Sequence, residues 1–224
     1  MEVFLPFIMI GAVLLIIGIS YFFSPKNIIL RAMKKVDATS ISRVQNDAYV
    51  KIIGKAKNVK EPLVAPLSGR PCLFYQVLVL KKRGKNGWDT VIDQTRTQDF
   101  FIEVQGEMAM VKMDGSQAFR KIYLDKDHKK TSGTWNDPTP RLEAFLQQNG
   151  ISSKGFFGFN KTMRYQEGII ELDERIAVKG IGNWKSLGEP IEGFHYSKIL
   201  SISGNKDRKL LITDLKKATQ PKVR

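Results

Sequence analysis

The sequence predicts a mainly β protein of the α+β class, with one N-terminal transmembrane helix and one small barrel- or sandwich-like β domain on which a helix packs. Three observations lead to this prediction. The chain of 224 residues begins with a long uncharged apolar stretch. The rest alternates short runs rich in β-branched and aromatic residues with turns that contain Gly, Asn, Asp or Pro. One later segment combines a helix cap with a single apolar stripe.

These features divide the chain into four parts. We expect a transmembrane helix over 3–23, a basic juxtamembrane helix and linker over 24–46, a β domain over 47–215 and a basic disordered tail over 216–224. The part after the apolar stretch is long enough to bury one core, or two small ones.

The apolar stretch, VFLPFIMIGAVLLIIGISYFF, contains no charged side chain between Val3 and Phe23. At a rise of ~1.5 Å per residue, a helix of this length spans about 31 Å, which matches the hydrocarbon core of a bilayer. A cleaved signal peptide is the alternative, because Gly18 and Ser20 resemble a small-residue cleavage site. Such a peptide would carry a basic n-region, which is missing here. The pattern therefore favours an integral, single-pass membrane protein.

Basic residues follow this stretch directly, whereas only Glu2 carries charge before it. They are Lys26, Arg31, Lys34 and Lys35. The positive-inside rule then predicts an outside N-terminus and a cytoplasmic domain, at the plasma membrane or, in a prokaryote, the inner membrane. We take these four residues as candidate contacts with the membrane surface. The helical spacing of apolar residues within 27–36 fits either an interfacial helix on lipid or a linker helix that packs on the domain.

The net charge of +14 is carried by the part of the chain after the apolar stretch. Next to an anionic membrane, each basic residue gains ~1 kcal/mol, so the lipid bilayer is the favoured partner and nucleic acid is less favoured. A merely solvated basic surface is the alternative. The chain has one cysteine and two histidines, Cys72, His128 and His195. A zinc ribbon or RING needs four ligands per metal, so neither is expected, and we predict no metal or cofactor.

The β domain is expected to begin near Ala48. The expected strands cover 48–57, 63–65, 72–81, 88–98, 99–104, 108–113, 122–124, two strands within 165–184, 199–202 and 210–215. The run over 72–81 is almost continuously apolar, which predicts a central strand. Gly54 is expected to form a bulge or tight bend in the first strand. The last two strands are expected to pair as a hairpin around Gly204.

A helix is predicted to start at Thr139-Pro140, where a cap precedes a proline at the first helical position. Leu142, Phe145 and Leu146 form its apolar stripe, and Asn149-Gly150 ends it. The charged segment before it, 125–137, is interpreted as a surface loop.

Several short motifs follow one another in a recognisable order between Ala48 and Thr213. They are Ile53-Gly54-Lys55-Ala56, the runs 63–68 and 71–75, Phe101-Ile102-Glu103, the run 164–170 and Val178-Lys179-Gly180. Together they resemble the GIDE domain of the GIDE/MULAN-type membrane E3 ubiquitin ligases and of their prokaryotic relatives, also called BAM (beside-a-membrane) proteins. The positions that match the family pattern are Gly54, Pro66, Leu67, Pro71, Cys72, Tyr75, Tyr165, Glu167 and Gly180.

The resemblance implies a β domain that engages a protein partner beside a membrane. The eukaryotic ligases add a second span and a C-terminal RING, and the three candidate ligands of this chain cannot build a RING. We therefore expect a non-catalytic interaction or sensing module, and the resemblance does not identify its protein partner.

Two other functions fit parts of the sequence. Phe156, Phe157 and Phe159 form a stacking surface for nucleic-acid bases on a basic barrel, a loop that dips into lipid or, more ordinarily, a piece of core. An enzyme with an unrecognised site would need Cys72, His195 and a carboxylate in one cleft. Cys72 opens an apolar strand, where a small buried residue is the usual interpretation. The sequence contains neither a phosphate-binding glycine loop nor a nucleophile elbow.

Overall fold

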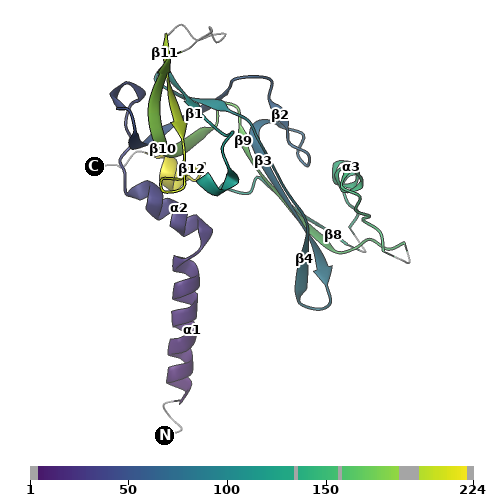
Figure 1. Cartoon of the computed structure of the whole chain (residues 1–224). Helices are drawn as coiled ribbons and strands as arrows, with labels where there is room; N and C mark the ends of the chain where they lie inside the picture. Colours follow the sequence, from purple (N-terminus) through teal and green to yellow (C-terminus); the bar gives the residue numbers. More distant parts are fainter. Residues whose placement is uncertain (1–4, 134–135, 156–157, 187–196, 221–224) are drawn as a thin grey trace.

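The structure, a computed structural model, describes residues 5–133, 136–155, 158–186 and 197–220. Its β part consists of two sheets, and a helix, α1 (Leu5–Phe22), projects from this part toward the N-terminus (Figure 1). The mainly β class predicted from the sequence is confirmed. One sheet closes into a five-stranded barrel, and the other meets the barrel at one end and extends away from it (Figure 1).

The barrel is a ring of five strands. In order they are β1 (Ala48–Asn58), β5 (Phe100–Val104), β6 (Glu107–Val111), β11 (Lys198–Ser203) and β10 (Arg175–Ser186), which pairs back onto β1. Two short strands, β12 (Leu210–Thr213) and β7 (Arg120–Ile122), extend the sheet beyond β10. Apolar side chains from every ring strand fill the interior, and the fully buried ones include Ile52, Phe100, Val178, Leu200 and Ile202.

The ring closes at β1, which pairs with β10 along one edge over residues 48–55 and with β5 along the other edge over residues 55–58. Lys55 is opposite Arg175 of β10 on one edge and Glu103 of β5 on the other. A Cβ atom on the neighbouring Gly54 would collide with the carbonyl oxygen of Glu103. Gly54 lies in unbroken register with Ile176, so β1 has no bulge at this position. The residue is required for a close approach of two strands.

The last two strands do not form the expected hairpin. Instead, β12 pairs with residues 177–179 of β10, and β11 pairs with residues 181–186 of the same strand. The twelve residues of β10 are long enough to hold both short strands in succession. Its neighbour in sequence, β9 (Met163–Glu171), belongs to the other sheet.

The second sheet, which we call sheet B, is built around β3 (Pro71–Arg83). It pairs with β9 on one edge and with both β2 (Leu63–Val64) and β4 (Gly87–Thr97), which confirms the central position predicted for it. The outermost strand is β8 (His128–Ser132), in a segment for which the sequence predicted a surface loop. The loop prediction is wrong, because HKKTS pairs with β9 through its backbone at the edge of the sheet. The segment contains no apolar residue whose spacing would indicate a strand.

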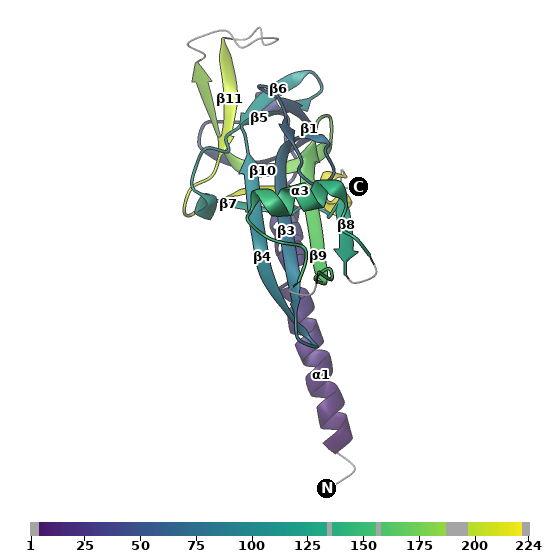
Figure 2. The ribbon, with the colours of Figure 1, turned by 90° about the vertical axis from the view of Figure 1, so that its right-hand side faces the viewer.

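The predicted helix is confirmed as α3 (Pro140–Gln148), with Thr139 as its cap. It lies across sheet B, as Figure 2 shows. Leu142, Phe145 and Leu146 pack there with Val77, Val79 and Tyr165, among others, and form a core separate from the barrel interior.

Two further helices cover the outside of the barrel. On α2 (Pro25–Lys34), Ile29 and Met33 are 0 % and 1 % exposed, and they pack with Ile53, Ala177 and Leu211. Of the two alternatives for this segment, the structure therefore favours a linker helix packed on the domain. A short helix, α4 (Lys216–Thr219), joins the same cluster through buried Ala218. A disordered tail is thus wrong for 216–219, and 221–224 lie outside the described residues.

The segment expected to be a polar linker also contributes to the core. It contains a 3-10 turn, Ile41–Arg43, and both Ile41 and Val44 are buried in the barrel interior. No single helix within the described residues has the length and apolar composition of a membrane span. The helical segments Met9–Phe22 and Pro25–Lys34 have this length and composition only when they are taken together, and the pair is bent by 58°.

Candidate functional site

The bend between α1 and α2 is held by side chains of α2. Ser24 caps the start of α2 and accepts a hydrogen bond from the backbone N–H of Asn27 at 3.3 Å. Asn27 Nδ2 donates to the Tyr21 carbonyl at 2.7 Å, and Arg31 Nη1 donates to the Phe22 carbonyl at 2.6 Å. The Arg31 guanidinium also lies 3.8 Å from the centre of the Phe22 ring. Carbonyls that the end of α1 leaves without helical partners are thereby satisfied, which fixes the angle between the helices.

The other end of α2 is held by two lysines of the barrel wall. Lys51 on β1 and Lys179 on β10 are cross-strand partners. Lys51 Nζ donates to the Met33 carbonyl at 3.2 Å, and Lys179 Nζ donates to the Ala32 carbonyl at 2.8 Å. Cations at a helix C-terminus interact favourably with its dipole, so this lysine pair orients α2 on the barrel.

Burial and neighbouring charge both act on Lys179. Burial lowers the pKa of Lys179, and the nearby charges of Lys35 and Lys51 lower it further. The Lys179 ammonium also lies 4.9 Å from the centre of the Tyr49 ring, where an aromatic face attracts a cation. Burial raises the pKa of the Tyr49 phenol, which donates a hydrogen bond to the Lys209 carbonyl at 2.6 Å.

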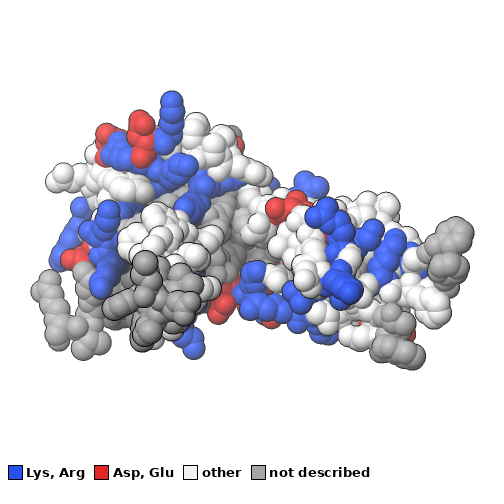
Figure 3. Space-filling model, turned by 90° about the horizontal axis from the view of Figure 1, so that it is seen from below, with Lys and Arg blue, Asp and Glu red and all other residues white. Residues whose placement is uncertain are grey.

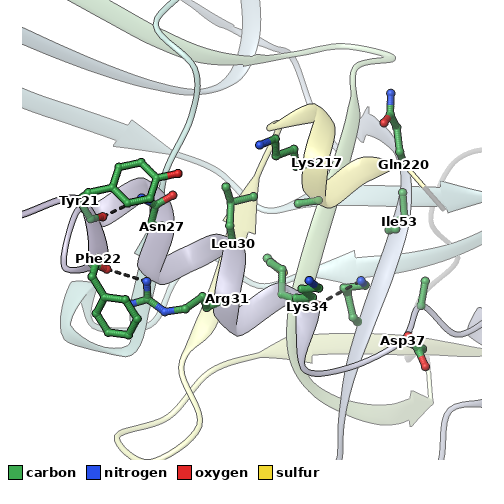
Figure 4. Close-up of a pocket in the computed structure, with 14 residues that line it drawn as sticks. Tyr21, Phe22, Asn27, Leu30, Arg31, Lys34, Asp37, Ile53, Lys217 and Gln220 are labelled. Carbon is green, nitrogen blue, oxygen red and sulfur yellow. Dashed lines mark hydrogen bonds between the residues drawn. The ribbon is translucent and has the colours of Figure 1, made fainter. Parts of the chain in front are cut away.

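A pocket of about 920 Å³ lies between the end of α1, α2, α4 and β1 (Figure 4). The apolar part of its lining includes Leu30, Met33, Ile53 and Ala218. Its cationic groups include Arg31, Lys34 and Lys217, and Asp37 also lines it. We call this cavity the junction pocket. An apolar surface beside several cations suits an amphipathic anion better than a neutral polar ligand.

The four basic residues predicted to meet the membrane surface divide into two groups. Arg31 and Lys34 line the junction pocket. Lys26, in the first turn of α2, and Lys35, its C-cap, are exposed and are not among the lining residues. Sequence reasoning missed Lys51, Lys179 and Lys217. A lysine in a strand normally faces solvent, and Lys217 lies in the segment interpreted as a disordered tail, so no sequence signal distinguished them.

Most of the positions that resemble the GIDE pattern lie at one end of sheet B, where they support the fold. Glu167 is fully buried, and its carboxylate accepts hydrogen bonds from the backbone N–H groups of Leu67 at 2.7 Å and Ser68 at 3.0 Å. This contact holds the turn between β2 and β3 against β9. Tyr75 and Tyr165 pack in the core under α3.

The remaining motif positions are also structural. Pro66 precedes Leu67 in the β2–β3 turn, and Pro71 opens β3 opposite Val64. Gly180 is in the barrel wall, where a Cβ atom would lie 2.7 Å from the Ser203 carbonyl oxygen. Cys72 is buried, and burial together with the charge of Glu167 raises the pKa of its thiol to about 11. A thiol with so high a pKa is a poor nucleophile at neutral pH.

The residues of the two alternative functions are only partly described. His195, Phe156 and Phe157 lie outside the described residues, and Phe159 is 66 % exposed. His128 opens β8, opposite Glu167 in register. Among the described residues, no group of three or more His, Cys, Asp or Glu side chains is arranged to hold a metal ion.

A group of carboxylates lies where the barrel meets sheet B. Glu174 accepts a hydrogen bond from the backbone N–H of Glu171 at 2.9 Å, and both carboxylate oxygens of Asp214 accept from the N–H of Asp125 at 2.9 Å. Burial, together with the charges of neighbouring carboxylates, Asp127 among them, raises the pKa of Glu174 to about 7 and that of Asp214 to about 6.

The chain is a mainly β protein with a closed barrel, a second sheet and a projecting apolar helix. No family model, no curated protein and no solved structure matches this chain.

Proposed function

We propose that this chain is a membrane-anchored interaction module of the GIDE/BAM type, in which α1 crosses the bilayer and the β part meets a protein partner without catalysis. The N-terminus would lie outside and the β part on the cytoplasmic side. The observation that carries the proposal is the exposure of α1. Its large apolar side chains from Met9 to Phe22 are 50–71 % exposed, and nothing charged interrupts them. Monomeric soluble proteins rarely leave so large an apolar surface in water.

The surroundings of α1 support this placement. Tyr21, Phe22 and Phe23 lie at its C-terminal end, where aromatic residues concentrate at a membrane–water interface. The cationic side of the junction pocket begins at the same level, because Phe22 and Arg31 both line it. Anionic headgroups would meet Arg31, Lys34 and Lys217 there.

Non-catalytic function is supported by the roles of the motif residues. The positions that resemble the GIDE family pack, cap or allow close approach in the described structure, and the Cys72 thiol is buried. The three Cys and His residues of the chain are too few for a RING. Full-length protein added to ubiquitin-charged conjugating enzyme should therefore leave the rate of ubiquitin discharge unchanged, and an accelerated discharge would contradict this part of the proposal.

Membrane anchoring is tested by placing charge at the centre of α1. The double variant V13R/L14R should move the full-length protein from the membrane pellet to the supernatant after alkaline extraction, because each arginine at a bilayer centre costs ~3 kcal/mol. V64R is the matched control, since Val64 is an equally exposed apolar residue on the β part (64 %). Wild-type protein in the supernatant would refute the anchor.

A further inference from the structure

Sheet B has a face that is covered only in part. Along β3, Val77 and Val79 point toward α3, so Leu78 and Leu80 lie on the opposite face. Nearer the start of the strand, that opposite face packs on the barrel interior through Phe74. From Leu78 onward the side chains there are half-buried or exposed. We call this part, together with the hairpin turn after β3, the hairpin face.

The hairpin face carries aromatic and basic residues. Lys82 is opposite Trp88 across the hairpin, and Arg164 of β9 is opposite Leu80. The Arg164 guanidinium lies 4.0 Å from the centre of the Trp88 ring. Arg83 and Lys85 at the turn and Lys129 on β8 are exposed. Two acids accompany them: Asp89 pairs with Arg83 at 3.4 Å, and Asp93 lies opposite Leu78.

The hairpin points in the same direction as α1. Figures 1 and 2 show the β3–β4 turn level with the C-terminal part of α1, on the side of the molecule toward the N-terminus. Seen from that side, Lys and Arg gather over the sheet B half of the molecule with few acids between them (Figure 3). A bilayer crossed by α1 would therefore face these cations.

We propose that the hairpin face is a second membrane contact, which binds the anionic headgroups of the bilayer beside α1. This inference rests on the proposed anchoring by α1. Clustered Lys and Arg residues are attracted to anionic lipid by ~1 kcal/mol each within about a Debye length of the surface. Trp88 and the two leucines add an apolar surface of the kind found at membrane interfaces. With contacts at α1 and at the hairpin, the β part would lie against the bilayer in one orientation.

The experiment uses the full-length variant N86C, labelled at the hairpin turn with an environment-sensitive fluorophore. The natural Cys72 is buried and does not compete for the label. The labelled protein is reconstituted into vesicles of phosphatidylcholine alone or of phosphatidylcholine mixed with phosphatidylserine. In the mixed vesicles we expect a blue-shifted emission that a lipid-phase quencher reduces and that added salt reverses. In phosphatidylcholine alone the label should report water.

Charge-reversal variants test whether the fluorescence signal depends on the hairpin lysines or on the overall positive charge of the protein. In the N86C background, K82E/K85E should reduce the phosphatidylserine-dependent signal by roughly tenfold or more, given the energy per basic residue. The matched control, K185E/K198E, makes the same charge change at the end of β10 and the start of β11, which lie far from α1 in Figure 1. All four lysines are exposed, so folding should be unaffected. The control should keep the full signal.

The outcomes distinguish the two proposals. If the protein stays in the vesicles but the label reports water in phosphatidylserine, the hairpin contact is refuted and the anchor stands. If the protein leaves both kinds of vesicle on alkaline extraction, the anchor itself has failed. If the label reports water on vesicles and K82E/K85E instead abolishes binding to a single-stranded oligonucleotide, the hairpin face serves nucleic acid and the membrane contact is refuted.

Discussion

At the scale of single residues, the carboxylates between barrel and sheet B make folding sensitive to pH. Burial raises the pKa of Glu174 from 4.5 to about 7 and that of Asp214 from 3.8 to about 6. Each group therefore holds its proton more tightly in the folded chain than in the unfolded one. The stability that these two groups contribute is largest at low pH. It is lost as the pH rises from the ordinary pKa of each group to its raised pKa in the folded chain, from 4.5 to about 7 for Glu174 and from 3.8 to about 6 for Asp214.

The variant E174Q tests this. Glutamine stays neutral and can still accept the hydrogen bond from the Glu171 backbone, so the variant should melt several degrees above wild type at pH 8 and converge with it near pH 4. Thermal unfolding of the full chain in detergent, followed by circular dichroism, measures both. E61Q, an exposed position, should parallel wild type. Parallel wild-type and E174Q curves would show that Glu174 ionises normally.

Individual residues of the junction pocket were only half predictable. Arg31 and Lys34 follow an apolar stretch, and that order marks basic residues at a membrane surface. Lys51 and Lys179 act through their cross-strand pairing and through contact with a helix that is distant in sequence. A pairing register is a tertiary property, and neither residue differs in sequence from a lysine that faces water.

At the scale of elements, the lysine pair determines how α2 sits on the barrel. Replacing both lysines with methionine keeps the aliphatic stems but removes two hydrogen bonds and the charge at the helix end. We expect the double variant K51M/K179M to lower the protection of α2 amides by about 1–3 kcal/mol in hydrogen exchange, because each charge-assisted contact contributes ~1 kcal/mol or more. The variant K55M alters an exposed lysine on the same strand and should leave α2 protected. Unchanged α2 exchange in the double variant would show that apolar packing alone holds the helix.

Elements with strong local signals were predicted correctly from the sequence. The cap and stripe of α3 and the apolar run of β3 each reflect physics contained within a dozen residues. Failures occurred where partners decide the structure. β8 is a strand because its backbone pairs with the edge of β9. The helix α4 packs against α2 and the barrel, which are distant from it in sequence. The separation of β11 from β12 depends on the length of β10, which no local pattern reveals.

At the scale of the whole molecule, two cores meet on one strand. Leu73 and Phe74 of β3 belong to the barrel interior, whereas Val77 and Val79 belong to the core under α3. The smaller core is covered on one side by a nine-residue helix, so it should open before the barrel does.

The variant L146A tests this order of stability. Removing this fully buried side chain should cost about 2–5 kcal/mol and expose amides of β4, β8 and α3 to hydrogen exchange while the barrel strands stay protected. L200A, in the barrel interior, should instead reduce protection throughout. Equal loss in both sheets of L146A would mean that the two cores unfold as one unit.

The closure of the barrel also constrains how the chain can be made. More than a hundred residues separate the end of β1 at Asn58 from the start of β10 at Arg175. A ribosome releases the apolar α1 first, while the strand that must complete the ring is still untranslated. Pairing between such distant segments forms slowly, so β1 spends this interval without its neighbour and open to chaperones or misfolding.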